Sequence, residues 1–288
     1  MSVLIIGCGD IGLRIAQQLL HAQHSEQIYG LVRSANAASH LTKQNIKPVL
    51  ADLDQTITLP TFTDALSIIY TAPPAQQGMH DTRLQNFLRA LNTQSVNRII
   101  YISTSGVYGD HKGNWVDETT LVNPQTERAK RRVDAEQHIQ TFAQQQNCAA
   151  VILRVPGIYG PGRLPIERLQ SGEAIIDPAE APYTNLIHAD DLASICVAAL
   201  TKGKGIYNVS DGTPLRNSDY YLAVAKLAGL PIPSFISLTE AQQQFSAMRL
   251  SFINEARRLR INKLEKEIAP VLRYRNLAEG IKASLLEK

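Results

Sequence analysis

A glycine-rich hexapeptide near the start of the chain has a composition and spacing that can do chemistry. Gly7-Cys8-Gly9-Asp10-Ile11-Gly12 follows a short apolar run at residues 2–6. In a GxGxxG turn the first glycine permits a tight strand-to-helix turn, the second lets the backbone approach a pyrophosphate, and the third allows close helix packing. The helix N-terminus then faces the phosphate charge. The hexapeptide therefore predicts a dinucleotide site with contacts at Gly7, Gly9, Asp10, Ile11 and Gly12.

The residues on either side of the hexapeptide support this interpretation. The run at residues 2–6 is short and apolar, as a buried parallel strand should be. After the turn, Ile11, Ile15 and Leu19 recur every four residues, which is typical of a helix buried on one face. A plain tight turn that contains glycines by chance is the alternative, and the flanking strand and helix favour the cofactor site.

The end of the second predicted strand bears on which dinucleotide is bound. The strand at residues 27–32 is followed by Arg33-Ser34, where an acidic residue would normally accept the ribose 2′-hydroxyl. A guanidinium can pair bidentately with a phosphate, so Arg33 and Ser34 favour a 2′-phosphate. The sequence thus predicts NADP in preference to NAD. Two alternatives stay open, namely that Arg33 is a surface residue or that a neighbouring loop supplies an acid.

The order of predicted elements indicates the fold class. Further strands at residues 47–50, 67–72 and 98–102 alternate with helical patterns such as the apolar stripe in residues 84–91. Alternation of this kind implies parallel strands joined by right-handed crossovers. We predict an α/β protein with a Rossmann doubly wound parallel sheet and a small, mostly helical C-terminal substrate domain.

Composition excludes several classes of function. The chain has 288 residues, 44% of them hydrophobic, and its net charge of +3 is too small to indicate nucleic-acid binding. Cys8, Cys148 and Cys196 lack the paired spacing of a disulfide framework or a metal site. No signal peptide is evident, and no run approaches the ~18 apolar residues of a membrane span. We expect a cytoplasmic protein with a small-molecule substrate, no metal, and neither nucleic acid nor membrane as partner.

The fifth predicted strand leads into a motif of a known family. Ser103-Thr104-Ser105-Gly106-Val107-Tyr108-Gly109 lies at its carboxyl end, where ligand sites of open α/β sheets occur. This run resembles the Ser/Thr-rich "VYG" segment of extended short-chain dehydrogenase/reductases, the NAD-dependent epimerase/dehydratase family that includes UDP-galactose epimerase. Residues 153–162, 185–193 and 205–209 resemble three later segments of the same family. Together the four motifs span nearly the whole chain in the family's order.

The resemblance implies a domain plan and further site residues. An NAD(P)-binding domain would occupy residues 1–162, completed by about 184–210, and a small substrate-binding domain would combine residues 163–183 and 211–288. Additional cofactor contacts are implied at Asp52, Leu53, Thr71, Ala72, Pro73, Ser103, Pro156 and Ile158. Substrate contacts are expected at Tyr159, Arg163 and Arg249. The helices that pair subunits in this family would lie near residues 80–96 and 128–146, so a monomer and a homodimer both stay open.

Local signals add expectations for two helix starts. Asp190 or Asp191 is expected to cap a helix that begins at Leu192. Ser218-Asp219 is expected to cap a later helix, which Gly229 and Pro231 would end.

One part of the family pattern is missing. The family's chemistry rests on a tyrosine followed four residues later by a lysine, and alignment on flanking residues places Arg128 and Arg132 there. A register shifted by two residues gives Thr126 and Lys130 instead. Arginine stays protonated and threonine is a very weak acid, so neither pair can cycle a proton as a phenol does. Arg132 could still bind a ribose or phosphate oxygen.

Two hypotheses about function follow. The first is an NAD(P)-dependent epimerase, dehydratase or reductase acting on a nucleotide sugar or a similar hydroxyl or carbonyl substrate. Thr104 would match the hydroxyl that the family aims at the substrate oxygen, and Tyr108 or Tyr159 would supply the missing phenol unless both are packing groups. The second hypothesis, favoured by the missing tyrosine, is a non-catalytic NADP(H)-binding redox sensor or scaffold.

Overall fold

A seven-stranded parallel sheet forms the base of the molecule. The computed structural model describes residues 2–22, 27–91 and 94–286. The strand order is β12-β7-β5-β4-β1-β2-β3, and every pairing is parallel. The strands are β1 (Ser2–Ile6), β2 (Gln27–Val32), β3 (Lys47–Leu50), β4 (Leu66–Tyr70), β5 (Val96–Thr104), β7 (Ala149–Val155) and β12 (Gly205–Asn208). This confirms the predicted Rossmann sheet.

The strand order reverses between β1 and β4, which run side by side in the middle of the sheet. Ile6 pairs with Leu31 of β2 and with Tyr70 of β4, so these strands end at the same level. Residues of β1 and β4 are buried at every position, because helices cover both faces of the sheet. Open α/β sheets bind ligands at this kind of switch point, outside the carboxyl ends of the strands.

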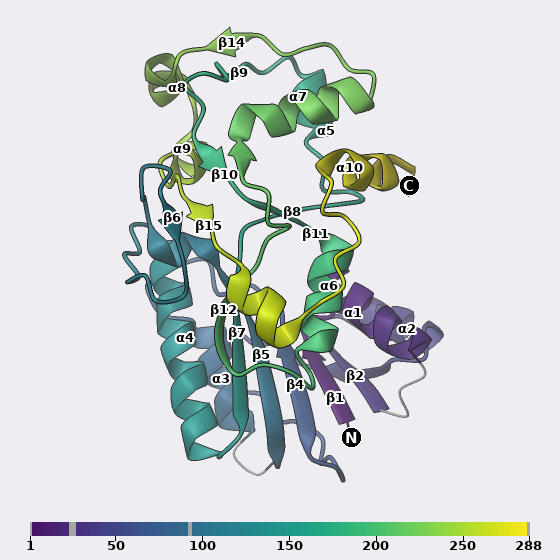
Figure 1. Ribbon diagram of the computed structural model, residues 1–288. Helices are drawn as coiled ribbons and strands as arrows, with labels where there is room; N and C mark the ends of the chain where they lie inside the picture. The colour runs from purple at the N-terminus through teal and green to yellow at the C-terminus, as the bar shows by residue number, and fades with distance from the viewer. Residues whose placement is uncertain (1, 23–26, 92–93, 287–288) are drawn as a thin grey trace.

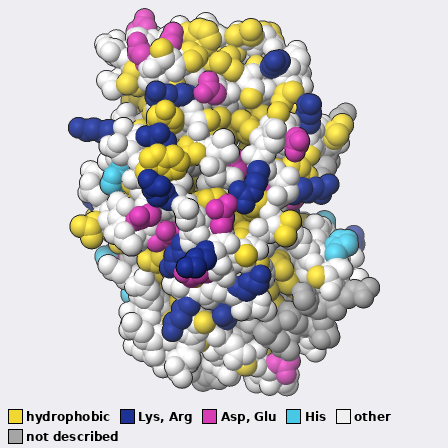
Figure 2. Space-filling model, in the orientation of Figure 1, with side chains coloured by type: hydrophobic (Ala, Val, Ile, Leu, Met, Phe, Trp, Pro, Cys, Tyr) yellow, Lys and Arg dark blue, Asp and Glu magenta, His cyan; other side chains and the backbone are white. Residues whose placement is uncertain are grey.

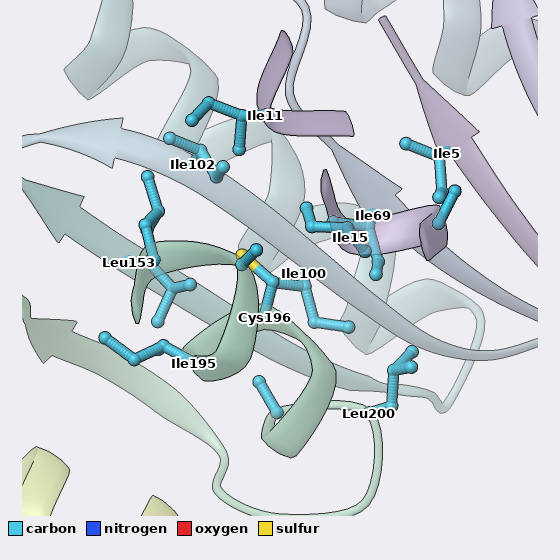
Figure 3. Packing of buried hydrophobic residues seen from close by; sticks show 14 of the residues in the cluster. Ile5, Ile11, Ile15, Ile69, Ile100, Ile102, Leu153, Ile195, Cys196 and Leu200 are labelled. Carbon is cyan, nitrogen blue, oxygen red and sulfur yellow. The ribbon is translucent and has the colours of Figure 1, made fainter. Parts of the chain in front are cut away.

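Helices cover the two faces of the sheet in two groups (Figure 1). One face carries α1 (Asp10–His21), α2 (Ala35–Lys43) and α6 (Ala189–Ala198), and the other carries α3 (Thr82–Ala90) and α4 (Glu127–Gln145). Figure 3 shows how Ile15 of α1 and Cys196 of α6 pack with Ile69 and Ile100 of the sheet. The apolar stripe that the sequence indicated for α1 therefore faces the core.

A small lobe lies over the carboxyl ends of the strands (Figure 1). Its helices are α5 (Ile166–Gln170), α7 (Asn217–Leu227), α8 (Leu238–Gln244), α9 (Ala247–Ile253) and α10 (Leu277–Leu286). Two strand pairs accompany them, β9 (Ile175–Ile176) with β14 (Phe235–Ile236) and β10 (Tyr183–Thr184) with β13 (Leu215–Arg216). The mostly helical lobe agrees with the predicted fold class, and residues 163–183, which look loop-like in sequence, contain α5 and β9.

Shorter elements connect the lobe to the sheet. They are η1 (Ser105–Tyr108), β6 (Trp115–Val116), β8 (Gly157–Tyr159), β11 (Leu186–His188), β15 (Arg258–Leu259) and the π-helical η2 (Leu264–Ile268). After α9 the chain returns to the sheet, where Ile261, Leu264 and Ile268 join the core beside α6. The C-terminal segment after residue 211 is therefore not confined to the small lobe, and the domain limits given above stay a prediction.

Both predicted helix caps differ from the structure. Helix α6 begins at Ala189, and the Nδ1 atom of His188 accepts the cap hydrogen bond from the Asp190 amide at 3.1 Å. Asp191 instead accepts hydrogen bonds from two amides of the C-terminal segment, at residues 273 and 274. Helix α7 begins at Asn217, and no side chain in the described ranges caps it, because Ser218 donates its hydroxyl to the Ile176 carbonyl. In each case a tertiary partner takes the polar group that the local pattern assigned to the cap.

The buried carboxyl group of Asp211, which follows β12, should make the stability of the protein depend on pH. The side chain is 2% exposed, and burial raises its pKa to about 7. The unfolded chain loses this proton near pH 4, while the folded chain keeps it up to about pH 7. We therefore expect the free energy of unfolding to fall by about 1–4 kcal/mol between pH 4 and pH 7 on account of this group.

Urea denaturation at several pH values tests this expectation. Asp211→Asn should flatten the decline, whereas Asp219→Asn, at an exposed position of α7, should leave it in place. An identical slope in the wild type and in Asp211→Asn would contradict the assignment.

Candidate functional site

The glycine-rich turn connects β1 to α1 in the middle of the sheet. Gly7 has a φ of +82°, and a Cβ atom there would lie 2.7 Å from the backbone of Ala72. A Cβ atom on Gly12 would lie 2.8 Å from the carbonyl oxygen of Gly7. By contrast, apart from the chain neighbours of Gly9, no described residue has an atom within 4 Å of the position of a Cβ atom on Gly9. The first and third glycines are thus required by packing, while the second borders open space at the N-terminus of α1.

Backbone groups and one hydroxyl hold this turn in place. The amides of Gly7 and Cys8 both donate to the Leu31 carbonyl of β2, at 3.2 Å. Thr71, expected at the cofactor, donates its hydroxyl to the Gly7 carbonyl at 2.7 Å. The N-terminus of α1 has no side-chain cap within the described part of the chain. Because the first-turn amides of a helix have no carbonyl partner in the helix, they can bind an anion over Gly9.

Four charged side chains surround the start of α1. The Asp10 carboxylate accepts hydrogen bonds from Arg14 Nε at 2.8 Å and from Arg163 Nε at 2.5 Å. Arg14 also donates to Asp190 of α6 at 2.5 Å. Burial alone would raise the pKa of Asp10, but the two arginines lower it overall. Arg163, which the resemblance placed at the substrate, therefore lies against the glycine-rich turn.

The predicted adenosine contacts lie at the ends of β2 and β3. Arg33 is exposed directly after β2, and Ser34 caps α2 by accepting a hydrogen bond from the Ala37 amide at 3.3 Å. Asp52 lies beside them, because the amide of Ala51 donates to the Val32 carbonyl. Leu53 is buried and its carbonyl accepts from the Asn86 side chain, while the Pro73 carbonyl accepts from Arg83. The fold thus brings Arg33, Ser34 and Asp52 to one edge.

The carboxyl end of β5 carries two hydroxyl groups with different surroundings. Ser103 is buried and donates to Glu136 Oε1 at 2.5 Å, and Glu136 also forms a buried ion pair with Arg154 at 2.7 Å. Thr104 is only partly buried, and its Oγ1 accepts a hydrogen bond from the Gly106 amide at 3.2 Å. Since Thr104 acts there as an acceptor, its hydroxyl proton is available to a ligand, whereas the hydroxyl of Ser103 is occupied.

The two candidate phenols both lie in the interior. Tyr108 is fully buried, donates its hydroxyl to Asn208 Oδ1 at 2.8 Å, and has a pKa that burial raises to about 12. Tyr159 is 1% exposed and packs edge-on against His188, with ring centroids 5.1 Å apart. Within residues 2–22, 27–91 and 94–286, the Tyr159 hydroxyl has no hydrogen-bond partner. These positions agree with the alternative that both tyrosines are packing groups.

The arginines at the expected Tyr and Lys positions lie one turn apart on α4. Arg132 donates to the Tyr101 hydroxyl at 2.8 Å and to the Ile102 carbonyl at 3.1 Å, under the end of β5. Arg128 stacks its guanidinium on the ring of Phe252 in α9, 4.0 Å from the centroid. Thr126, which takes the tyrosine position in the shifted register, is the N-cap of α4. Its side chain already accepts a hydrogen bond from the Ala129 amide.

A carboxyl group that the sequence did not indicate lies next to Thr104. Glu255, just after α9, is 7% exposed, and burial raises its pKa while Arg257 and Arg128 partly oppose the shift. A Cβ atom on Gly106 would lie 3.2 Å from Glu255 Oε2 and 3.4 Å from Thr104 Oγ1. Glu255 Oε1 is buried without a hydrogen-bond partner among the described residues. Thr104 and Glu255 therefore flank one point at the end of β5.

The sequence around Glu255 contains no motif that marks it as a site residue, because only the tertiary fold brings this side chain to the end of β5. The next charged residue, Arg257, donates to the Gly109 carbonyl at 2.9 Å and to Ser105 Oγ at 3.3 Å. It also approaches Glu255 Oε2 at 3.5 Å. These contacts attach the segment after α9 to the loop after β5. Recognising the site from sequence would require knowing that residues 105 and 257 touch.

Of the remaining predicted residues, Arg249 lies apart from this point, whereas Pro156 directly follows Val155, which pairs with Thr104. Arg249 pairs with Glu173 at 3.1 Å and stacks on Phe245 inside the small lobe. Pro156 follows β7, and Ile158 of β8 pairs with β11. On the face shown in Figure 2, basic side chains are interspersed with acidic ones and form no continuous stripe. Within the described ranges, no three His, Cys, Asp or Glu side chains form a metal-binding group, and no helix could cross a membrane.

Comparisons with known proteins agree with this geometry. The model of the NAD dependent epimerase/dehydratase family matches residues 3–210. Protein YeeZ of Escherichia coli K12 is 28% identical over 246 residues, which cover 81% of this chain and 86% of that protein. A functionally unknown conserved protein from Silicibacter pomeroyi superimposes with a TM-score of 0.81 at 29% identity, over 99% of this chain and 98% of that chain.

A second similar structure is described with a ligand. UDP-glucuronic acid 4-epimerase from Bacillus cereus, solved in complex with NAD, has a TM-score of 0.75 at 19% identity. The match covers 99% of this chain and 95% of the epimerase. At this identity the likeness is one of fold.

The glycine geometry yields a matched pair of substitutions. Gly12→Ala would place a methyl group 2.8 Å from a backbone oxygen, and we expect it to lower the free energy of unfolding by about 1–3 kcal/mol. Gly9→Ala adds the same methyl group in open space and should change stability by less than about 0.5 kcal/mol. Chemical denaturation followed by circular dichroism measures both, and equal stabilities would contradict this account of the turn.

Proposed function

The chain belongs to the NAD dependent epimerase/dehydratase family, and from this premise we propose that it binds a nicotinamide dinucleotide at the glycine-rich turn and uses it in an oxidoreductase-type reaction. The observation that carries the proposal is the open space over Gly9 in front of the uncapped helix α1. At the switch point of a Rossmann sheet, this is the arrangement that accommodates a pyrophosphate.

The residues present fit the pyrophosphate, the adenosine ribose and the nicotinamide of such a cofactor. The first-turn amides of α1 would bind the pyrophosphate. Arg33, Ser34 and Asp52 would surround the adenosine ribose, and Pro156 with Ile158 would border the nicotinamide. When bound, the nicotinamide supplies the acceptor or donor of a hydride.

We propose NADP as the preferred form because of the end of β2. Arg33 is an exposed cation where an acid would accept the 2′-hydroxyl of NAD, and Ser34 adds a hydroxyl. Both nearby acids already have partners: Asp52 Oδ1 accepts a hydrogen bond from the Asp54 amide at 3.1 Å, and Asp54 pairs with Arg83 at 2.6 Å. The Bacillus cereus epimerase, by contrast, is described with NAD.

The proposed substrate is a nucleotide sugar or a similar compound with a hydroxyl or carbonyl carbon. The Bacillus cereus relative acts on such a sugar by its name, and the end of β5 offers the required polar groups. In our proposal Thr104 donates a hydrogen bond to the substrate oxygen. The Glu255 carboxylate accepts the hydroxyl proton as the carbonyl forms and returns it in the reverse direction, which is general acid–base catalysis without a phenol.

One observation favours the second function, a cofactor-bound sensor or scaffold without catalysis. Both Tyr108 and Tyr159 have buried hydroxyls, and α4 carries arginines at the expected catalytic positions. A protein whose partner binding changes between NADPH and NADP would support that function.

The cofactor assignment is tested by titrating nicotinamide fluorescence. We expect NADPH to bind more tightly than NADH, and Arg33→Ala to weaken NADPH binding roughly 10-fold because a charge-assisted contact is lost. NADH binding should change little. Arg89→Ala, which removes an arginine from α3, is the matched control. Equal effects of Arg33→Ala on both cofactors would argue against the 2′-phosphate contact.

The role of Glu255 is tested with UDP-glucose and dTDP-glucose as substrates. Glu255→Gln should lower turnover by about 10²–10⁴-fold and leave cofactor affinity unchanged. Because only the carboxylate accepts a proton, oxidation by the wild type should speed up as pH rises through the raised pKa of Glu255. The Gln variant should lack this rise, whereas Glu173→Gln in the small lobe should retain it. A normal pH profile in Glu255→Gln would assign the proton transfer elsewhere.

A further inference from the structure

Arg163 ends a turn that contains Gly160 and Gly162, and its side chain reaches the glycine-rich turn. The turn is closed by a hydrogen bond from the Arg163 amide to the Gly160 carbonyl at 3.0 Å. Gly160 and Gly162 have φ values of +152° and +69°, and the space around Gly162 is open. From this turn, which follows β8, the guanidinium contacts the Asp10 carboxylate at 2.5 Å. Residues 10 and 163 thereby connect the sheet to the edge of the small lobe.

The two arginines on Asp10 are held unequally. Arg14 lies between the carboxylates of Asp10 and Asp190, and its side chain is 18% exposed. Arg163 is 35% exposed, and among residues 2–22, 27–91 and 94–286 its ion-pair partner is Asp10 alone. Arg14 is thus fixed between α1 and α6, while Arg163 is bound by one exposed partner and directly follows Gly162, whose backbone is less restricted than that of other residues.

The negative charge of a pyrophosphate would attract Arg14 or Arg163, so the difference in how the two arginines are held decides which one can move. A pyrophosphate on the first-turn amides of α1 would bring two negative charges next to the Asp10 carboxylate. If Arg163 turned toward the phosphates, Asp10 would still be paired with Arg14 at 2.8 Å. If Arg14 moved instead, Asp190 would lose its arginine partner, and the Nδ1 atom of His188 would stay 3.6 Å from its carboxylate. Arg163 is therefore the cation that can leave while Asp10 and Asp190 both keep an arginine partner.

We propose that Arg163 is a ligand of the cofactor pyrophosphate, exchanging Asp10 for the phosphate oxygens when the dinucleotide binds. This inference rests on the proposed function and assigns Arg163 to the cofactor in place of the substrate. A guanidinium pairs bidentately with phosphate oxygens, so the exchange replaces one charge-assisted contact by a stronger one. Asp10 then acts as a competitor of the phosphates that holds Arg163 beside the glycine-rich turn.

The experiment measures binding of NADH by fluorescence and displacement of NADH by ADP-ribose, which carries both phosphates but no nicotinamide. Arg163→Ala should weaken NADH and ADP-ribose about 10- to 100-fold, and Arg163→Lys should restore part of the loss. Weak competition by adenosine, which lacks phosphate, should be unaffected. Arg168→Ala is the matched control, because Arg168 lies five residues further on with a similarly exposed side chain paired to Glu173.

Asp10→Asn distinguishes two possible roles of Arg163. In one, Arg163 binds the phosphates of the cofactor; in the other, its ion pair with Asp10 only locks the two lobes together. Both Arg163→Ala and Asp10→Asn break the same ion pair, so a lock predicts that they shift NADH affinity in the same direction. A phosphate ligand predicts opposite directions, with weaker binding in Arg163→Ala and tighter binding in Asp10→Asn.

The outcomes distinguish this inference from the function it rests on. If the wild type binds NADH or NADPH and Arg163→Ala binds equally well, or if both substitutions act in the same direction, the inference is overturned and the proposed function stands. If the wild type binds neither dinucleotide nor ADP-ribose, the proposed function fails and this inference fails with it.

Discussion

The close approach of three backbone segments at Gly7 is the constraint on which the rest of the site depends. The ends of β1 and β4 and the start of α1 meet there so tightly that a single Cβ atom on Gly7 or Gly12 would overlap backbone atoms. Because no side chain fits, the N-terminus of α1 lies directly at the switch point of the sheet. The hydrogen bond from Thr71 to the Gly7 carbonyl fixes the same junction from β4.

A buried polar network fixes the end of β5, on the other side of the candidate site from the glycine-rich turn. Glu136 of α4 accepts hydrogen bonds from Ser103 of β5 and from Arg154 of β7, and the Arg154 guanidinium lies over the ring of Tyr108. Buried charges are costly unless each is paired and hydrogen-bonded, so the network tolerates few alternative arrangements. It therefore holds the end of β5, and with it Thr104, at a defined place relative to α4.

Local features were predictable from sequence and long-range ones were not. The strands and the glycine turn depend on short apolar runs and on three glycines, so their pattern was enough to place them. The predicted cap of α6 was wrong because Asp190 and Asp191 bind residues far along the chain, which leaves the cap to His188. The hydroxyl of Tyr108 likewise depends on Asn208, a hundred residues away. Glu255 and Arg163 reach their neighbours only through folds of the chain that no local signal describes. The motif containing Thr104 could be recognised, but the carboxyl group next to it could not.

The return of the chain to the sheet after α9 affects how the molecule can unfold. Ile261, Leu264 and Ile268 complete the core beside α6 before the chain enters the small lobe again as α10. Asp191 ties the following segment to α6 through two backbone amides. The lobes therefore share one cooperative unit, since melting the small lobe would pull apolar groups out of the sheet's own core. Separating the lobes would therefore require breaking these contacts of the shared segment with the sheet and with α6.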